Sequence, residues 1–373
     1  MLDFPFEESS FWTALYCIVF FFYLTLTNFK RGIANIYKVR IPTYKKQCAV
    51  FLIAFFIITH CYSGDFFHFM ETVHNYDFTP GQYNYGEKIY LLIGECLNRN
   101  YFLFRIAIWG GSFILFCLTA KRMNIPVYYA AIFLALSFSI TFSNARVTAA
   151  MTTYYYGLSF LCVPMNKSKV LGYLIGFALI ICSTIFHNSA FIMVILSILV
   201  FMPLRKNLVV LIICLIPLLS LLLKDYFELI LYDESTDEIV ARKMQRYSER
   251  EMDFGISSYI LNTSKYLSFY FPIIICLYTI FKYKKQHISY AILKMGKVVF
   301  GLVLTSTCFI ILGQEFFTFY YRILFMTMIP LCLISTKLYC DQIISRKMYL
   351  WCCIPGIVSQ VMFYCYNLYC ELI

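Results

Sequence analysis

The sequence predicts an all-α fold, a polytopic transmembrane helical bundle of about 12 spans with both termini outside (N-out and C-out). The first observation behind this prediction is composition. Of 373 residues, 61% are hydrophobic and only 14% are charged, whereas a soluble domain is about one quarter charged. The second observation is that the basic residues form short clusters between apolar runs. That pattern orients a membrane protein, and it argues against a nucleic-acid-binding surface.

Twelve apolar runs are the predicted spans, in two halves of the chain. Because alternating polar residues are lacking in these runs, we predict helices rather than the strands of a barrel. Several runs are short, and flanking Tyr, Phe and Lys residues can extend them into the interface. The runs cover residues 11–27, 48–62, 101–120, 125–142, 147–163, 170–186, 189–202, 208–223, 266–281, 298–312, 323–336 and 348–366.

Charge divides the connecting segments into two alternating sets. One set holds 20 of the 31 Lys and Arg residues and a single acid, Asp341, so the other 19 acids lie in the opposite set. The positive-inside rule places the basic set in the cytoplasm. Both termini then face outward and the number of spans is even. The acidic N-terminus lacks the basic start of a signal peptide, so we expect the first span to be retained.

Two outward segments, 63–100 and 224–265, exceed the usual loop length, and such loops are more often functional than not. No repeat and no Gly/Pro-rich linker divides the sequence, so we predict one integral membrane domain, residues 1–373. The 16 cysteines are scattered without a Cys-x-x-Cys pair. They are typical of small apolar core residues rather than of zinc or disulfide sites.

Arg146 begins a predicted span at the outer edge and is the first candidate for function. Ala149, Ala150, Thr153 and Gly157 follow it on one helical face, and so small a face predicts close helix contact or a lined cavity. A charge deep in the bilayer costs about 2.5–3.5 kcal/mol, so a buried arginine implies an anionic partner. The competing interpretation is an arginine that snorkels to lipid phosphate.

Two further candidates lie at the same predicted edge. His187 stands in the short connection His187-Asn-Ser-Ala190, and Arg322 follows two tyrosines at the head of another span. Taken singly, such a histidine is usually structural and such aromatic residues usually pack. The convergence of two arginines, one histidine and two acid-bearing segments on one side favours a functional site.

These motifs together resemble the EpsG family of bacterial exopolysaccharide and capsule polymerases, which are distantly similar to Wzy O-antigen polymerases. The matching pieces extend over most of the sequence, from Asp65 to Arg322. They are Gly64-Asp65, Gly86-Glu-Lys-Ile-Tyr-Leu-Leu92, Arg146 with Ala149, His187-Asn-Ser-Ala190 and Tyr321-Arg322. Val147 departs from the family, which often has glutamine after this arginine. Arg146 and Gly157 also satisfy the Arg-x10-Gly spacing of O-antigen polymerases, as do Arg99 and Gly110.

The resemblance implies a glycosyltransferase that joins oligosaccharide repeat units carried on polyprenyl diphosphate, at the outer face of the bacterial inner membrane. A hydroxyl of one sugar attacks the anomeric carbon of another, which requires a base and a positive charge on the departing diphosphate. Arginine suits the second task because its fork meets phosphate oxygens bidentately. The candidate bases are Asp65, Glu87 and His187, and the candidate diphosphate ligands are Arg146, Arg322 and Lys88.

The expected partners are the lipid-linked glycan and membrane lipid, with a chain-length regulator and a flippase as further candidates. No metal and no other cofactor is expected, because arginine can neutralise the leaving group. Two other classes stay open. A transporter or flippase of lipid-linked sugars would be equally apolar, but it would more often show inverted repeats and broken helices. A membrane O-acyltransferase would fit the His-x4-Asp spacing of His60 and Asp65.

Overall fold

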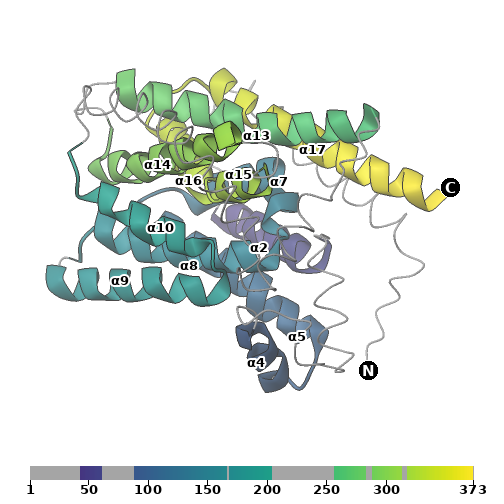
Figure 1. Ribbon diagram of the computed structural model, residues 1–373, viewed down its shortest axis with the longest axis horizontal. Coiled ribbons are helices and arrows are strands. Elements are labelled where there is room, and N and C mark those ends of the chain that lie inside the picture. The colour runs from purple at the N-terminus through teal and green to yellow at the C-terminus, as the bar shows by residue number, and fades with distance from the viewer. Residues whose placement is uncertain are drawn as a thin grey trace.

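The computed structural model describes residues 43–60, 88–165, 168–203, 256–282, 288–312 and 317–372. These residues form helices and the turns between them, without a strand (Figure 1). Four helical stretches among them are long and apolar enough to cross a membrane, judged by length and composition: Tyr101–Arg122, Lys169–Phe186, Tyr290–Phe309 and Tyr320–Cys340. The all-helical prediction is therefore confirmed for this part of the protein.

The helices follow one another with short connections wherever both neighbours are described. The first half contains α2 (Thr43–His60), α4 (Lys88–Cys96), α5 (Tyr101–Arg105), the π-helix η2 (Ile106–Gly110), α6 (Gly111–Arg122), α7 (Val127–Phe142), α8 (Ala145–Cys162), α9 (Lys169–Phe186), α10 (Ala190–Leu196) and the 3₁₀-helix η3 (Ser197–Val200). The second half contains α13 (Ile256–Lys282), α14 (Tyr290–Leu312), α15 (Phe317–Phe325), α16 (Met328–Cys340) and α17 (Arg346–Leu372).

Ten of the twelve predicted spans coincide with these helices, and the runs 11–27 and 208–223 lie outside the described residues. Several boundaries differ: α2 begins at Thr43, α15 begins at Phe317, and the run 323–336 is divided between α15 and α16. Helix α14 begins at Tyr290, so Lys294 and Lys297 are helical residues rather than loop residues, and α13 begins at Ile256, inside the segment predicted as a loop. A helix satisfies its own backbone hydrogen bonds, so it can continue past its apolar stretch. The number of spans and their orientation stay predictions.

Helix α8 is the centre of the bundle. Sixteen of its 18 residues are buried, and it packs against α6, α9, α10, α14 and α16. Figure 1 shows α9 lying along α8. The opposite side of α9 is an exposed apolar stripe, formed by Val170, Leu174, Phe177, Ile181 and Ile185. Water would penalise such a stripe, whereas lipid would not.

Basic side chains gather at one end of the bundle, where they hydrogen-bond to carbonyls at helix C-termini. Arg122 Nη2 donates to the Val163 carbonyl over 2.5 Å, and Lys294 Nζ donates to the Leu161 carbonyl over 2.9 Å. Lys297 Nζ donates to the Met202 carbonyl, beyond η3. Cations at helix C-termini satisfy unpaired carbonyls and oppose the helix dipole. We call this the basic end.

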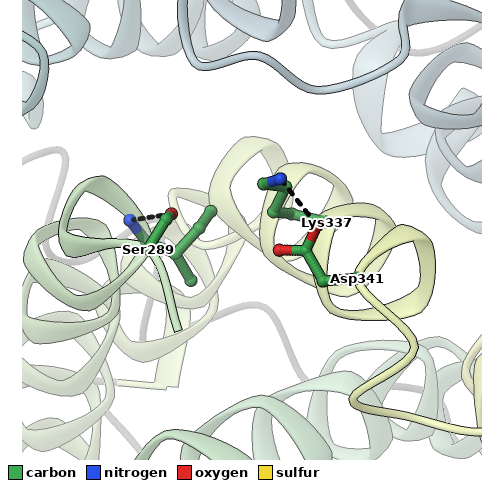
Figure 2. A network of polar contacts seen from close by, with 4 residues as sticks. Ser289, Lys337 and Asp341 are labelled. Carbon is green, nitrogen blue, oxygen red and sulfur yellow. Dashed lines mark hydrogen bonds and ion pairs between the residues drawn. The ribbon is translucent and has the colours of Figure 1, made fainter. Parts of the chain in front are cut away.

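The first turn of α14 and the last turn of α16 lie at the basic end as well. Figure 2 shows Ser289, whose hydroxyl accepts a bond from the Ile292 amide at 3.4 Å, next to the pair formed by Lys337 and Asp341, 2.7 Å apart. Helices α14 and α16 pack against each other. Because α14 begins at the basic end and α16 ends there, the two helices run antiparallel. The charge pattern predicted that the segments holding Arg122, Lys294, Lys297 and Lys337 lie on one side of the membrane, and these contacts agree with that grouping.

Candidate functional site

Two glycines bring α8 and α9 into backbone contact. A Cβ atom at Gly157 would lie 2.8 Å from the Gly176 carbonyl oxygen, and a Cβ at Gly176 would lie 3.0 Å from that of Gly157. No other residue fits this crossing without displacing a helix, because real Cβ atoms do not approach backbone so closely. The small face that the sequence predicted after Arg146 is therefore a close helix contact at Gly157.

The crossing places Arg146 and His187 at the same level. Arg146 precedes Gly157 by 11 residues, and His187 follows Gly176 by 11 residues. Because the helices are antiparallel, both residues lie about 16 Å from the crossing, toward the end opposite the basic end. Eleven residues are about three turns, so Arg146 lies on the face of α8 that carries Gly157.

The contact between α8 and α9 continues along the whole of α9. Its buried residues are Gly172, Gly176, Ile180 and Ser183, which form one stripe with helical spacing. His187 lies one turn beyond Ser183 and is half-buried, as is Arg146. The register of the two helices therefore brings the backbones of Arg146 and His187 to the same end of this helix pair. We call this place the α8–α9 corner.

His187 ends α9 and has an extended backbone, with φ −161° and ψ 128°. The backbone N–H of Ser189 donates to its Nδ1 atom over 3.1 Å, and the Ser189 hydroxyl lies 2.5 Å from the same nitrogen. The His187 carbonyl in turn accepts from the Ala190 amide at 3.0 Å. The tight connection between α9 and α10 thus fixes the orientation of the imidazole ring.

Helix α4 docks onto this same corner. The Tyr90 hydroxyl donates to the Phe186 carbonyl over 3.0 Å, next to His187, and the two rings meet edge to face with centroids 6.3 Å apart. Lys88 is the first residue of α4, so its backbone lies within a turn of Tyr90. The motifs at 86–92 and 187–190, far apart in sequence, are neighbours in space. The Lys88 side chain and the predicted bases Asp65 and Glu87 lie outside the described residues.

Arg105 is a site candidate that the sequence reasoning missed. It is only 3% exposed, and its guanidinium carbon lies 5.2 Å from the centroid of the Trp109 ring. The Trp109 Nε1–H donates to the Ser143 carbonyl over 3.0 Å, three residues before Arg146. A short π-helix, Ile106–Gly110, places the indole there, and such π-helices are frequent at functional sites. The available signal was that Arg105 is the sole charge in the run 101–120.

Arg322 lies on α15 and is positioned by α8. The Tyr155 hydroxyl donates to the Met326 carbonyl over 2.8 Å, where the chain turns between α15 and α16. Arg146 precedes Tyr155 by nine residues, and Arg322 precedes Met326 by four. Arg322 therefore lies about one turn before the Met326 carbonyl, on α15.

Tyrosines of α13 and α15 gather beside Arg322. The Tyr266 ring contacts those of Tyr320 and Tyr321, with centroids 6.1 and 5.2 Å away, and the Tyr270 hydroxyl is hydrogen-bonded to that of Tyr320. Tyr266, Tyr270 and Tyr321 are only partly buried. Tyrosine has both an apolar ring face and a hydroxyl. A sugar ring likewise has an apolar face and hydroxyl groups, so a tyrosine side chain can contact both.

Helix α7 is broken in the core at Phe138, whose φ and ψ are −141° and 16°. The Gln360 side chain of α17 donates to the Leu136 carbonyl and is hydrogen-bonded to the Ser139 hydroxyl. A Cβ at Gly356 would lie 2.4 Å from the Ser137 Cα atom, so α17 needs this glycine to approach the break. Neither glycine nor proline stands in α7, which is why the sequence pattern did not reveal the break.

Among the described residues, no three His, Cys, Asp or Glu side chains group as a metal site. Comparisons with protein-family models, curated proteins and solved structures found no match for this protein.

Proposed function

We propose that this protein is a membrane glycosyltransferase that polymerises oligosaccharide repeat units carried on polyprenyl diphosphate. The products are capsule, exopolysaccharide or O-antigen chains. The observation that carries the proposal is the α8–α9 corner, where the segments that hold Arg146 and His187 come together at one end of the bundle, with α4 docked beside them. The resemblance to EpsG polymerases supports the same function, because three of its motifs, around Lys88, Arg146 and His187, come from these segments.

The proposed roles follow from charge. Arg146, Arg322 and Lys88 bind the diphosphate of the donor lipid, whose negative charge grows as it leaves. A carboxylate, Asp65 or Glu87, accepts the proton of the attacking hydroxyl. The tyrosines beside Arg322 fit the sugars of a repeat unit.

We place the protein in the bacterial inner membrane as a multi-pass protein with this corner on the outer side. The exposed apolar stripe of α9 supports a membrane setting, and the basic end supports the orientation by the positive-inside rule. A flippase supplies the lipid-linked units to that side, and a chain-length regulator is a further candidate partner.

Deletion in the native host tests the proposed function. We expect loss of long polymer and accumulation of single lipid-linked repeat units on the outer side. The measurement is the surface glycan profile, combined with mass spectrometry of extracted lipid-linked intermediates. An unchanged polymer would contradict the proposal, and a full-length polymer that lacks acyl groups would indicate an O-acyltransferase instead.

The break in α7 favours a second candidate, a transporter or flippase of lipid-linked sugars. Broken helices near the middle of a bundle are common at transporter substrate sites, and at this break Ser139 of α7 is hydrogen-bonded to Gln360 of α17 in the core. The same deletion distinguishes the two. Loss of a flippase leaves lipid-linked units on the cytoplasmic side, where an external enzyme cannot modify them.

A further inference from the structure

Helix α13 carries a single line of exposed apolar side chains. Between Tyr266 and Phe281, its exposed residues recur at alternating steps of four and three: Leu267, Phe271, Ile274, Tyr278 and Phe281. All the residues between them are buried or half-buried. At about 1.5 Å per residue the line is about 21 Å long, which is most of the depth of a bilayer core of about 30 Å. We call it the α13 seam.

The α13 seam differs from the exposed surface of α9. Helix α9 exposes neighbouring residues side by side, as a broad face that suits bulk lipid: Lys169, Val170 and Leu171, then Phe177 and Ala178, then Ile181 and Cys182. The seam is one side chain wide, and α17 lies beside it (Figure 1). The Trp351 ring of α17 stacks on Phe271, with centroids 6.4 Å apart. A narrow line with an aromatic border fits one hydrocarbon chain.

The two ends of the seam differ in chemistry. Leu267 follows Tyr266, whose ring contacts that of Tyr321, next to Arg322, with centroids 5.2 Å apart. At the other end, Lys282 Nζ donates to the Tyr278 hydroxyl over 2.7 Å. Helix α13 ends at Lys282, and α14 begins only eight residues later, at the basic end. The seam therefore runs from the tyrosines beside Arg322 toward the basic end.

We propose that the α13 seam binds the polyprenyl chain of the donor lipid, with the diphosphate toward Arg322; this proposal rests on the proposed function and deepens it. A polyprenyl chain is a hydrocarbon with a methyl branch and a double bond in every unit. Because its surroundings are also apolar, the hydrophobic effect does not select it over phospholipid. Packing against fixed side chains supplies the selectivity instead, and the rings of Phe271, Tyr278 and Phe281 provide that surface.

Photo-crosslinking tests the occupant directly. The photoreactive residue benzoylphenylalanine replaces Ile274 in the full-length protein, in phospholipid nanodiscs, and the probe is polyprenyl diphosphate. Ile181 of α9 is the matched control, because the two isoleucines are almost equally exposed, 62% and 60%. We expect labelling from position 274 to exceed that from 181 by about tenfold, the ratio for a preference of about 1.4 kcal/mol. Equal labelling would show bulk lipid, and a cross-link between two protein copies would show a dimer surface; either result overturns the proposal.

The distal end of the seam gives a second test. Phe281 and its control on α9, Phe177, are both exposed, and each contacts one further ring, with centroids 5.8 and 6.3 Å apart. Reconstituted protein is given lipid-linked repeat units whose prenyl chain is either full-length or shorter than the seam. We expect Phe281→Ala to raise the KM of the full-length donor by about fivefold, because about one kcal/mol of packing contacts is lost. The short donor should respond less, and Phe177→Ala should change neither KM.

The other results of this experiment separate the two proposals. An equal rise of KM for both donors would show a general structural effect, and no rise for either would show that the chain does not reach Phe281; both overturn the seam. If the wild-type protein forms no polymer from the full-length donor, the proposed function itself fails. Polymer formation without preferential labelling at position 274 overturns the seam alone. The cross-link needs no catalysis, so it decides the matter even if Phe281→Ala does not fold.

Discussion

Single side chains at the α8–α9 corner carry the proposed chemistry, and arginine and lysine differ there in a measurable way. Lysine keeps the charge of Arg146 but loses the planar fork that meets two phosphate oxygens. An arginine that merely snorkels to lipid phosphate would tolerate lysine, because both side chains have long apolar stems. Substitution thus separates a bound diphosphate from membrane anchoring.

We expect Arg146→Ala and Arg322→Ala each to lower polymer formation by roughly a hundredfold or more, because a desolvated phosphate contact is lost. Arg146→Lys should be impaired less. The measurement is polymer made at matched membrane abundance. Lys169, at the start of α9 in the basic half of the charge pattern, supplies the control: Lys169→Ala should leave the rate unchanged. Near-normal polymer formation by both alanine variants would refute the proposal that Arg146 and Arg322 bind the diphosphate.

The Trp109 indole ties the π-helix to the start of α8. We expect Trp109→Phe to lower the unfolding free energy by about 1–3 kcal/mol, because the buried Ser143 carbonyl loses its donor while the ring beside Arg105 remains. Trp351→Phe is the control, since Trp351 is 55% exposed on α17. Thermal unfolding in detergent measures both. An equal melting temperature for the two variants would contradict the proposed tie.

At the scale of elements, the pairing of α8 with α9 sets the geometry of the site. The level of Arg146 relative to His187 depends on where the helices cross, and the crossing depends on Gly157 and Gly176. Any residue that pushes the helices apart there moves the two side chains apart about three turns away. A mutation far from the chemistry should therefore impair it.

Gly157→Ala tests this dependence. Its Cβ would meet the Gly176 carbonyl oxygen at 2.8 Å, so we expect a lower melting temperature and at least a tenfold slower polymerisation. Gly111→Ala is the matched control, because a Cβ there meets nothing within 4 Å. Alanine in a helix interior is favoured over glycine by about 1 kcal/mol, so that variant should be unchanged or more stable. Full activity of Gly157→Ala would show that the crossing does not position the site.

At the scale of the whole molecule, the two ends differ in chemistry. Arg122, Lys294 and Lys297 bind helix C-terminal carbonyls at the basic end, and the α8–α9 corner lies at the other. The exposed apolar faces between them suit lipid. The proposed lipid-linked substrate would approach along the axis between these ends, with its headgroup at the corner.

Reporter fusions test the orientation. A fusion after Asn124, at the basic end, should read cytoplasmic, and a fusion after Asn98, between α4 and α5, should read external, by the positive-inside rule. A pair of reporters active on one side and silent on the other measures each position. If both fusions read the same side, the predicted orientation of this half of the protein is wrong.

The sequence alone determined the helical class, most helix positions and the alternation of charge, because these depend on local hydropathy and on charge near helix ends. It also singled out Arg146, His187 and Arg322 as residues at the ends of apolar runs. It could not show that Lys294 belongs to a helix, because a helix can extend beyond its apolar residues.

Only the tertiary structure decided which of these residues meet. The crossing at Gly157 and Gly176 joins the two helices that lead to Arg146 and His187, the indole of Trp109 brings Arg105 to the start of α8, and Gln360 stabilises a break in α7 that contains no proline or glycine. These are contacts between residues distant in sequence. Hydropathy reports the environment of each segment, whereas the partners of a side chain are set by how the helices pack.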